Sequence, residues 1–406
     1  MNNIFIIPPE VLFVIDRLES RGYRAYCVGG CVRDHLMGRE PGDYDVTTSA
    51  RPDEMLQVFS DCRLVETGLQ HGTVTIVRNG MNIEVTTYRI DGSYDDGRHP
   101  DSVTFTDKLS DDLCRRDFTI NAMAFSPENG VVDLYDGKED LKKRVIRCVG
   151  CAEERFTEDG LRIMRALRFA SVLDFTLDCE CSAAVFRLKH LLDKISRERI
   201  YTELTKLIGG VGAARILREY AAVVSQVLPD ISEESIKKAA DAIELDEKLY
   251  VSCGCERNTA MRYALLLDGL DYKVAQGAIN SLKPSRAVKN AVLMYKNLLP
   301  DPTAAGTARL MSKTDDLFPA SLARFACVLG KISHEDAKMR ESIADEIVKN
   351  DLPRRLSMLP VTGNDLAAMG FKGREIGEKL AEILELVMCA KIANTREDIE
   401  NYIKNC

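Results

Sequence analysis

Two short stretches, GGCVRD at residues 29–34 and DYDVTT at residues 43–48, decide how this chain is interpreted. The glycine pair follows the apolar run YCV at 26–28, which is typical of a short buried strand. Glycines allow a sharp turn and a close approach to a ligand, and amides at the start of a following helix would face a phosphate. Asp43 and Asp45 stand two apart on an expected strand, so both carboxylates would lie on one face. Two carboxylates at one point are the minimum for holding hard divalent cations against a nucleoside triphosphate.

Each signal alone has an ordinary explanation, since most Gly-Gly pairs are only turns and most Asp-x-Asp pairs are solvated. Together, within one strand–turn–helix–strand unit, they resemble the nucleotidyltransferase superfamily that shares a head with DNA polymerase beta. The resemblance is closest to the class II branch, which contains tRNA CCA-adding enzymes and bacterial poly(A) polymerases. The residues that carry it are Gly29, Gly30, Arg33, Asp34, Gly38, Asp43 and Asp45.

The resemblance implies an α+β fold in which a small mixed β-sheet head is followed by an all-α neck, body and tail. We expect the catalytic nucleotidyltransferase head at residues 1–150 and a neck with a nucleotide-reading helix at 151–210. A helical body would follow at 211–300 and a helical, tRNA-binding tail at 301–406. The length of 406 residues agrees, because it is too long for one compact core.

Composition limits the class of protein. A net charge of −8 counts against a bulk electrostatic nucleic-acid binder, although the local surface decides RNA binding. The 13 cysteines are scattered and lack zinc spacing, which favours reduced thiols in a cytoplasmic protein. We find no signal peptide at the N-terminus and no apolar run long enough to span a membrane. No protein partner is implied.

Alternation predicts a hairpin from TVTIV at 73–77 and NIEVTT at 82–87, joined around Asn79 and Gly80. Glu84 lies on its second strand. That carboxylate either joins the two aspartates or faces water at a strand edge, and alternation alone does not decide. The resemblance favours a role in the site, because the family has an acidic residue in this stretch.

The stretch RRDFTINAMA at 115–124 has a double arginine before an apolar run, which is often a salt-bridged helix end. It also matches the family's second motif, which is implied in holding the sugar and the triphosphate. Arg116 is the best candidate for the phosphates. Gly30 and Arg33 would bind the triphosphate with it.

From Thr157, a helix cap by type, the pattern becomes helical, and Asp159, Arg162, Arg165 and Arg168 form a row at three-residue spacing. The ordinary interpretation is a solvated, salt-bridged face. The other is base recognition: an aspartate accepts from the amino group of C or A, and an arginine donates to the adjacent ring nitrogen. U and G carry a ring N–H in place of that acceptor.

The resemblance implies the second interpretation, because the class II family uses a Glu-Asp-x-x-Arg helix as its nucleotide template. Glu158, Asp159 and Arg162 match that motif, and Arg165 and Arg168 match the arginines that follow. The resemblance implies that Asp159, Arg162, Arg165 and Arg168 all bind the substrate. The implied reaction is template-independent addition of CCA to the 3′ end of tRNA from CTP and ATP. Asp43 and Asp45 would hold two Mg²⁺ ions and so act as both the metal ligands and the catalytic residues.

Two alternatives share the same head: a bacterial poly(A) polymerase and an enzyme that adds only CC. The polar segment at 91–102 has no periodicity and predicts a mobile loop. In the family such a loop is implied in the switch from adding C to adding A, which argues against CC-only addition. An RNA-binding protein with an inactive head is a third alternative, and the intact motif residues count against it.

Overall fold

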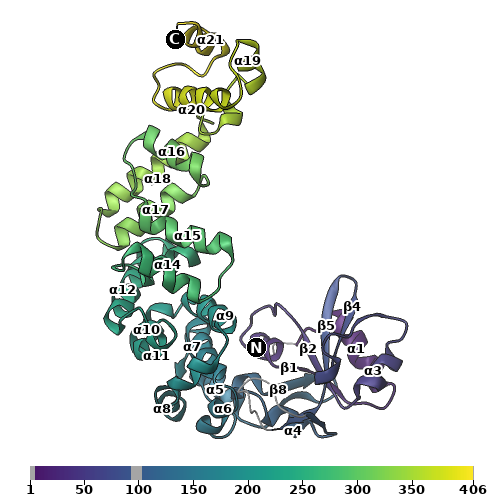
Figure 1. Ribbon diagram of the computed structural model, residues 1–406. Coiled ribbons are helices and arrows are strands. Elements are labelled where there is room, and N and C mark those ends of the chain that lie inside the picture. Colours follow the sequence, from purple (N-terminus) through teal and green to yellow (C-terminus); the bar gives the residue numbers. More distant parts are fainter. Residues whose placement is uncertain (1–4, 93–102, 406) are drawn as a thin grey trace. The chain divides into compact units, whose positions relative to one another are not determined.

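The structure is a computed structural model that describes residues 5–92 and 103–405 (Figure 1). The predicted loop at 91–102 therefore falls almost entirely outside the described residues. The chain separates into two compact units, Met1–Lys237 with Ser281–Lys283, and Lys238–Asn280 with Pro284–Cys406. The main sheet belongs to the first unit, and the second is helical, so the predicted α+β class is confirmed. The finer division into head, neck, body and tail stays a prediction.

The main sheet of the first unit has seven strands in the order β3-β4-β5-β2-β1-β8-β9. Only β2 and β5 pair in parallel, so the sheet is mixed, as predicted. The expected hairpin is present, with Asn79 and Gly80 both at positive φ in its turn. The strands are β1 (Ala25–Val28), β2 (Asp45–Thr48), β3 (Arg63–Val65), β4 (Thr73–Arg78), β5 (Met81–Thr87), β8 (Met123–Ser126) and β9 (Gly130–Asp133). Four short strands pair outside it: β6 (Arg89–Asp91) with β7 (Val103–Phe105), and β10 (Val145–Ile146) with β11 (Thr176–Leu177).

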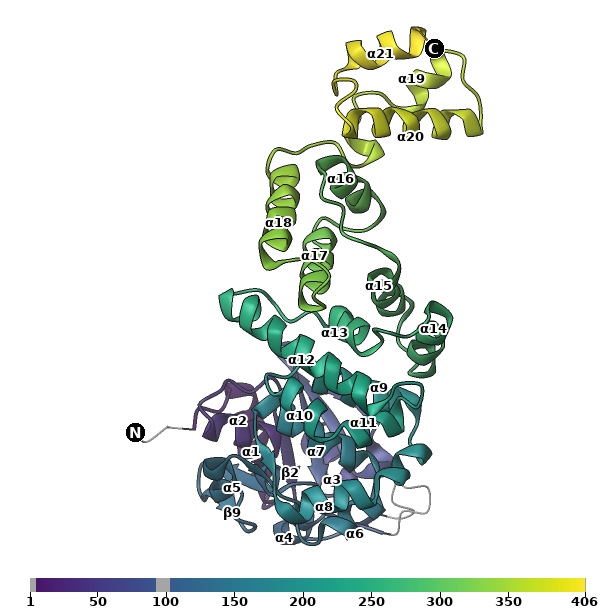
Figure 2. The same cartoon turned by 90° about the vertical axis from the view of Figure 1, so that its left-hand side faces the viewer.

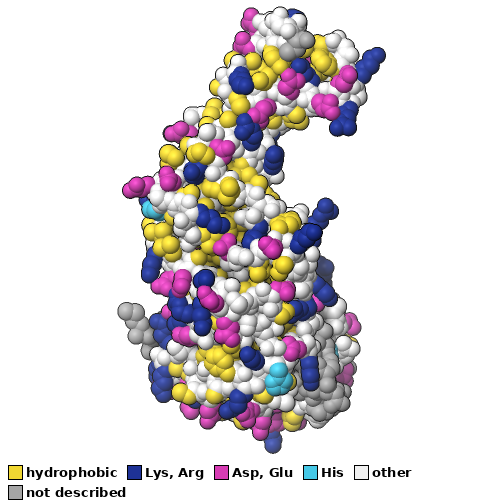
Figure 3. All heavy atoms as spheres, turned by 60° about the vertical axis from the view of Figure 1, so that its left-hand side comes forward, with side chains coloured by type: hydrophobic (Ala, Val, Ile, Leu, Met, Phe, Trp, Pro, Cys, Tyr) yellow, Lys and Arg dark blue, Asp and Glu magenta, His cyan; other side chains and the backbone are white. Residues whose placement is uncertain are grey.

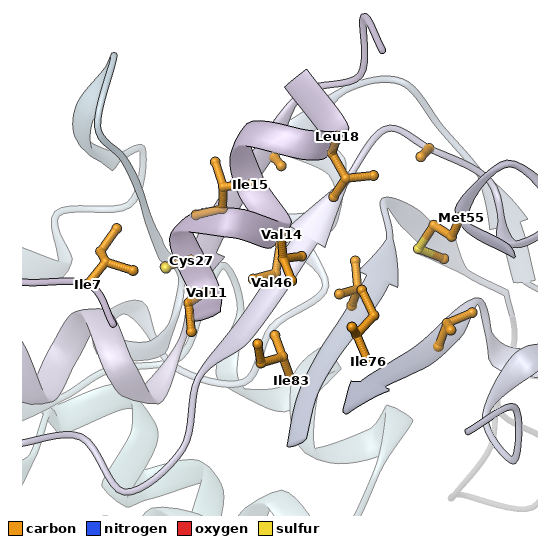
Figure 4. Close-up of a cluster of buried hydrophobic side chains, with 14 of the residues drawn as sticks. Ile7, Val11, Val14, Ile15, Leu18, Cys27, Val46, Met55, Ile76 and Ile83 are labelled. Carbon is orange, nitrogen blue, oxygen red and sulfur yellow. The ribbon is translucent and has the colours of Figure 1, made fainter. Parts of the chain in front are cut away.

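Helix α1 (Pro9–Glu19) covers one face of this sheet. Val11, Val14, Ile15 and Leu18 recur at helical spacing, and all four are fully buried. Figure 4 shows them beside apolar side chains of the sheet, such as Ile83 of β5. Each side chain buried in this way stabilises the fold by about 1.5–3 kcal/mol, so this core fixes the sheet that carries the site.

The predicted helix start at Thr157 is wrong. Thr157 lies inside α6 (Ala152–Glu158), where its hydroxyl donates to the Glu153 carbonyl. Asp159 then turns extended, with φ −137° and ψ 104°, and α7 (Leu161–Leu173) begins after Gly160. The sequence pattern hid the break because glycine and aspartate interrupt a run that keeps its helical spacing on both sides.

The other helices of the first unit surround these elements. They are α2 (Gly30–Leu36), α3 (Pro52–Val58), α4 (Leu109–Cys114), α5 (Gly137–Lys143), α8 (Cys179–Arg187), α9 (Arg197–Ile208), α10 (Ala213–Glu219) and α11 (Ala221–Val227). The helix α12 (Glu233–Leu249) begins in the first unit and continues in the second.

The second unit consists of stacked helices, which Figure 2 shows in side view. They are α13 (Thr259–Leu266), α14 (Tyr272–Ser281), α15 (Arg286–Asn297), α16 (Ala304–Lys313), α17 (Phe318–Val328), α18 (His334–Lys349), α19 (Gly363–Ala368), α20 (Arg374–Met388) and α21 (Arg396–Lys404). Pro284 separates α14 from α15, as predicted. Among the helices that the structure describes, none is long and apolar enough to cross a bilayer.

Candidate active site

The glycine turn lies between β1 and α2. Gly29 has φ +80°, a conformation that side chains oppose, and its N–H donates to the Met123 carbonyl at 3.2 Å. A Cβ built on Gly29 would lie 3.1 Å from Arg116 Nη1. The absence of a side chain therefore lets the Arg116 guanidinium approach the backbone where α2 begins.

The two aspartates lie next to this turn, but on different local structures. Asp45 is the first residue of β2, while Asp43 comes before the strand, so the expectation that both lie on one strand is wrong. The strand begins at Asp45, two residues later than the alternation indicated. Across the parallel pair, Asp45 stands directly opposite Glu84 of β5, which is exposed.

The charges of these three carboxylates act on each other. Burial, together with the negative charges of Asp43 and Glu84, raises the pKa of Asp45 to about 6, although the positive charge of Arg116 opposes the shift. A cation bound at Asp45 would relieve the repulsion that its carboxylate meets from the two neighbouring acids. Within residues 5–92 and 103–405, no group of three or more His, Cys, Asp or Glu forms a complete metal site. A cation held by the two aspartates would thus need further oxygens, such as those of a triphosphate.

Arg116 faces the glycine turn, and some of its N–H groups have no acceptor among the described residues. Its Nη2 donates to Asp112 at 3.2 Å, and its buried Nε has no acceptor among the residues that the structure describes. Asp112 is fully buried, and burial alone would raise its pKa, but Arg116 and Arg115 outweigh burial and keep it low. Arg116 is therefore held from behind by a charged carboxylate, while part of its guanidinium is left for an anion.

Arg33, on α2, is already engaged. Its Nε and Nη2 donate to Asp34 at 2.8 and 3.0 Å, and its Nη1 donates to Asn121 Oδ1 at 2.7 Å. A Cβ on Gly30 would lie 3.7 Å from Arg33 Nη2, so this guanidinium also faces the start of α2. Any phosphate contact by Arg33 has to use the N–H groups that remain.

The three arginines of α7 each have an acidic partner of their own. Arg162 donates to Glu158 at 2.5 Å and to the Arg115 carbonyl at 3.1 Å. Arg165 makes a two-nitrogen contact to Asp117, at 2.8 and 2.5 Å, and Arg168 Nε lies 2.7 Å from Glu203 of α9. The row thus consists of ion pairs, as the ordinary interpretation expects, but these are largely withdrawn from solvent rather than solvated.

Asp159 sits in the break between α6 and α7. Its Oδ1 accepts from the Leu161 N–H at 3.0 Å, and its Oδ2 accepts from Arg199 Nη2 at 2.8 Å. These contacts fix the carboxylate, and each oxygen keeps a lone pair for another donor. Arg199 is on α9, so α9 contacts both Asp159, just before α7, and Arg168 within α7.

Sequence reasoning missed the residues that connect these parts. Asn121 accepts from Arg33 and donates to Asp117 Oδ1 at 3.1 Å, while Asp117 binds Arg165. The segment 115–121 therefore contacts the glycine turn through Arg116, α2 through Asn121 and α7 through Asp117. Its unusual density of charged and amide groups ahead of an apolar run was the available signal. This segment thus connects the predicted site residues of the head with those of α7.

Comparison with known proteins agrees with this arrangement. Residues 25–147 match the model of the poly A polymerase head domain, and residues 174–240 match that of a probable RNA and SrmB-binding site of polymerase A. A CCA-adding enzyme of Geobacillus thermodenitrificans is 36% identical over 98% of this chain and 100% of its own length. The chain belongs to the family of CCA-adding enzymes.

Two further members extend the match. A CCA-adding enzyme of Lactobacillus delbrueckii is 45% identical, over 57% of this chain and 59% of its own length. The crystal structure of the Bacillus stearothermophilus CCA-adding enzyme in complex with CTP superposes with a TM-score of 0.75 at 31% identity, covering 99% of this chain and 100% of that one. The relation to CCA-adding enzymes thus extends along the whole chain. Helix α7 lies between the two stretches that the family models match.

Proposed function

We propose that this chain adds CCA to the 3′ end of tRNA, transferring nucleotides from CTP and ATP and releasing pyrophosphate. The observation that carries the proposal is the juxtaposition, at one glycine turn, of a carboxylate group that favours cations and a guanidinium with free donors. Both are needed where a triphosphate meets its metal ions. The match to CCA-adding enzymes over the full chain supports the specific product.

A divalent metal is part of this family's chemistry, and we infer that Mg²⁺ is the ion and that Asp43 and Asp45 hold it. Two such ions, when bound, would stabilise the negative charge on the attacking and leaving oxygens. The chain itself would place both carboxylates at the N-terminal end of β2. Asp45 must be ionised for this, and its pKa of about 6 leaves it so at neutral pH.

The triphosphate is proposed to lie over the glycine turn. Arg116 would donate its unused N–H groups to phosphate oxygens, with Asp112 holding it in place. Gly30 would allow the backbone to approach, and Arg33 would add its remaining donors. Arg116 is held by the buried Asp112, and Arg33 by Asp34 and the buried Asn121.

Base choice is proposed to rest on Asp159 and Arg162. The carboxylate would accept from the amino group of C or A, and the guanidinium would donate to the adjacent ring nitrogen. Arg165 and Arg168 would hold α7 against Asp117 and Glu203, and so position the reading pair. We also propose the cytoplasm as the location, in keeping with the free thiols of the described cysteines.

Two substitutions separate chemistry from base choice. Asp45→Ala is expected to abolish addition of any nucleotide, while Asp159→Ala keeps some transfer but incorporates U and G more readily. The measurement is incorporation of each of the four nucleotides into a tRNA that lacks its CCA end. Equal loss of all incorporation in Asp159→Ala, with unchanged folding by circular dichroism, would contradict the reading role.

A further inference from the structure

Helix α6 ends next to the reading pair, and the carboxylate of its last residue, Glu158, lies between two guanidiniums. Its Oε1 pairs with Arg155 Nη2, from one turn earlier on the same helix. Its Oε2 accepts from Arg162 Nη1 at 2.5 Å. The exposed fractions of the Arg155, Glu158 and Arg162 side chains are 17%, 26% and 10%, so solvent screens these charges only weakly. One acidic side chain is thus shared by two arginines, of which only Arg162 has a place in the proposed base choice.

The two arginines are also anchored on one stretch of backbone. Arg155 Nη1 donates to the Cys114 carbonyl at 3.4 Å, and Arg162 Nη2 donates to the next carbonyl, that of Arg115, at 3.1 Å. The Arg155 carbonyl accepts a further hydrogen bond from Arg162 Nη1 at 3.1 Å. Arg155 therefore holds the reading arginine in two ways, directly through its backbone and indirectly through Glu158.

These contacts leave Arg162 with donors for a base. Among the described residues, its acceptors are two backbone carbonyls and Glu158, which together occupy both hydrogens of Nη1 and one of Nη2. The N–H of Nε and the second N–H of Nη2 stay unused. These are the groups of Arg162 that can donate to the ring nitrogen of C or A.

The sharing of Glu158 limits what this carboxylate takes from the reading arginine. Arg155 occupies Oε1, so only Oε2 is directed at Arg162. A carboxylate and a guanidinium otherwise favour a two-bond contact, in which Glu158 would engage a second nitrogen of Arg162. A hollow of about 220 Å³ is lined by both Arg155 and Glu158, and it gives the carboxylate room to turn. Loss of Arg155 would therefore draw onto Glu158 a donor that base choice needs.

We propose that Arg155 is a positioning residue for base choice, which holds Glu158 so that the unused donors of Arg162 stay directed at the base. The inference rests on the proposed function, because Arg155 acts through the reading role of Arg162. Its own Nη atoms are engaged by Glu158 and the Cys114 carbonyl, so it has no need to touch the base. A purely structural Arg155 would only tie α6 to the end of α4, and its loss would then affect every nucleotide alike.

The test compares Arg155→Gln with the wild-type chain and with Arg187→Gln. Arg187, on α8, pairs with Glu153 of α6 at an exposed position, so this control removes an arginine contact to the same helix away from the reading pair. The kcat/KM values for CTP and UTP are measured on tRNA that lacks its CCA end. The Kd values of both nucleotides are measured without tRNA, and thermal unfolding checks the folding of each variant.

Arg155→Gln is expected to reduce the preference for CTP over UTP about tenfold, in kcat/KM and in Kd, because one hydrogen bond to the base is lost or misdirected. Arg187→Gln should keep the wild-type preference. Arg155→Lys keeps a positive charge beside Glu158 and should restore most of the preference. Glu158→Gln should also lower it, and adding Arg155→Gln to that variant should change it by less than about twofold, because both act through one contact.

An equal fall of kcat/KM for CTP and UTP in folded Arg155→Gln would overturn the inference, as would full additivity with Glu158→Gln. If Arg155→Gln does not fold, a wild-type preference in Glu158→Gln would overturn it instead. Failure of the proposed function looks different: the wild-type chain would bind CTP more tightly than UTP without extending tRNA, and the Kd values of the variants would still decide the inference. A wild-type chain that neither extends tRNA nor distinguishes CTP from UTP would overturn both.

Discussion

At the scale of the residue, Asp45 is a carboxylate whose ionised form is disfavoured in the folded protein. Burial and the charges of Asp43 and Glu84 disfavour its ionised form. Its folded pKa of about 6 lies above the ordinary value of 3.8. The metal-free protein should therefore lose stability as pH rises from about 4 to about 6, because ionising Asp45 costs more in the folded than in the unfolded chain.

Asp45→Asn removes this cost. We expect the metal-free variant to be more stable than the wild type at pH 7 by on the order of 2 kcal/mol, and to lose all nucleotide transfer. Urea unfolding in the presence of a chelator, at acid and neutral pH, measures the difference. Equal stability of the two proteins at both pH values would contradict the claim that the ionised Asp45 destabilises the fold.

Asn121 links Arg33 of α2, proposed to contact the triphosphate, to Asp117, which pairs with Arg165 of α7. Asn121→Ala should raise the KM for CTP and ATP about tenfold with a smaller effect on kcat, because Arg33 and Asp117 each lose a partner. Asn129→Ala is the matched control, since Asn129 bonds Tyr26 and Ser126 instead. A KM equal to that of the control variant would show that Asn121 is only structural.

At the scale of the element, α7 is attached to its surroundings by ion pairs as well as by its buried apolar side chains. Asp117 accepts from Arg165, Asn121 and the Phe118 N–H. Burial opposes its charge, but Arg165 and these hydrogen bonds lower its pKa to about 2. The pair therefore stabilises the fold above about pH 4, and this contribution is lost as pH falls towards 2.

Arg165→Met tests this attachment. It leaves the Asp117 carboxylate buried without its cation and should lower the free energy of unfolding by about 3 kcal/mol at pH 7. The control is Lys142→Met, which removes an exposed pair with Glu139 and should change stability by less than about 0.5 kcal/mol. If the two variants unfold at the same urea concentration, the Asp117 pair does not hold the helix.

The sequence predicted those elements whose signals are local. Asn79 and Gly80 fix their hairpin, and Pro284 ends a helix, because each acts through its own backbone. The break at Asp159 and the position of Asp43 before its strand were mispredicted. At Asp159, a contact from a distant segment, Arg199 of α9, holds the carboxylate, and spacing within the helix could not show it. The partners of the α7 arginines come from distant segments, so spacing within the helix could not reveal them.

At the scale of the molecule, net charge says little about partners. On the face shown in Figure 3, Lys and Arg side chains are interspersed with Asp and Glu, so neither sign dominates. Each unit also has a core of its own, around Val11 and Ile83 in the first and around Leu366 and Ile383 in the second. Binding of an RNA by so acidic a chain has to rest on local groups and not on its net charge.

The central claim, addition of CCA by this chain alone, is tested most directly with a tRNA that lacks its 3′ end. The wild-type chain is incubated with Mg²⁺ and CTP, ATP, or both, and the products are resolved to single nucleotides on a sequencing gel. The account predicts two C residues with CTP alone, and two C followed by one A with both. A product that stops after two C even with ATP present, or a long ladder of A, would contradict it.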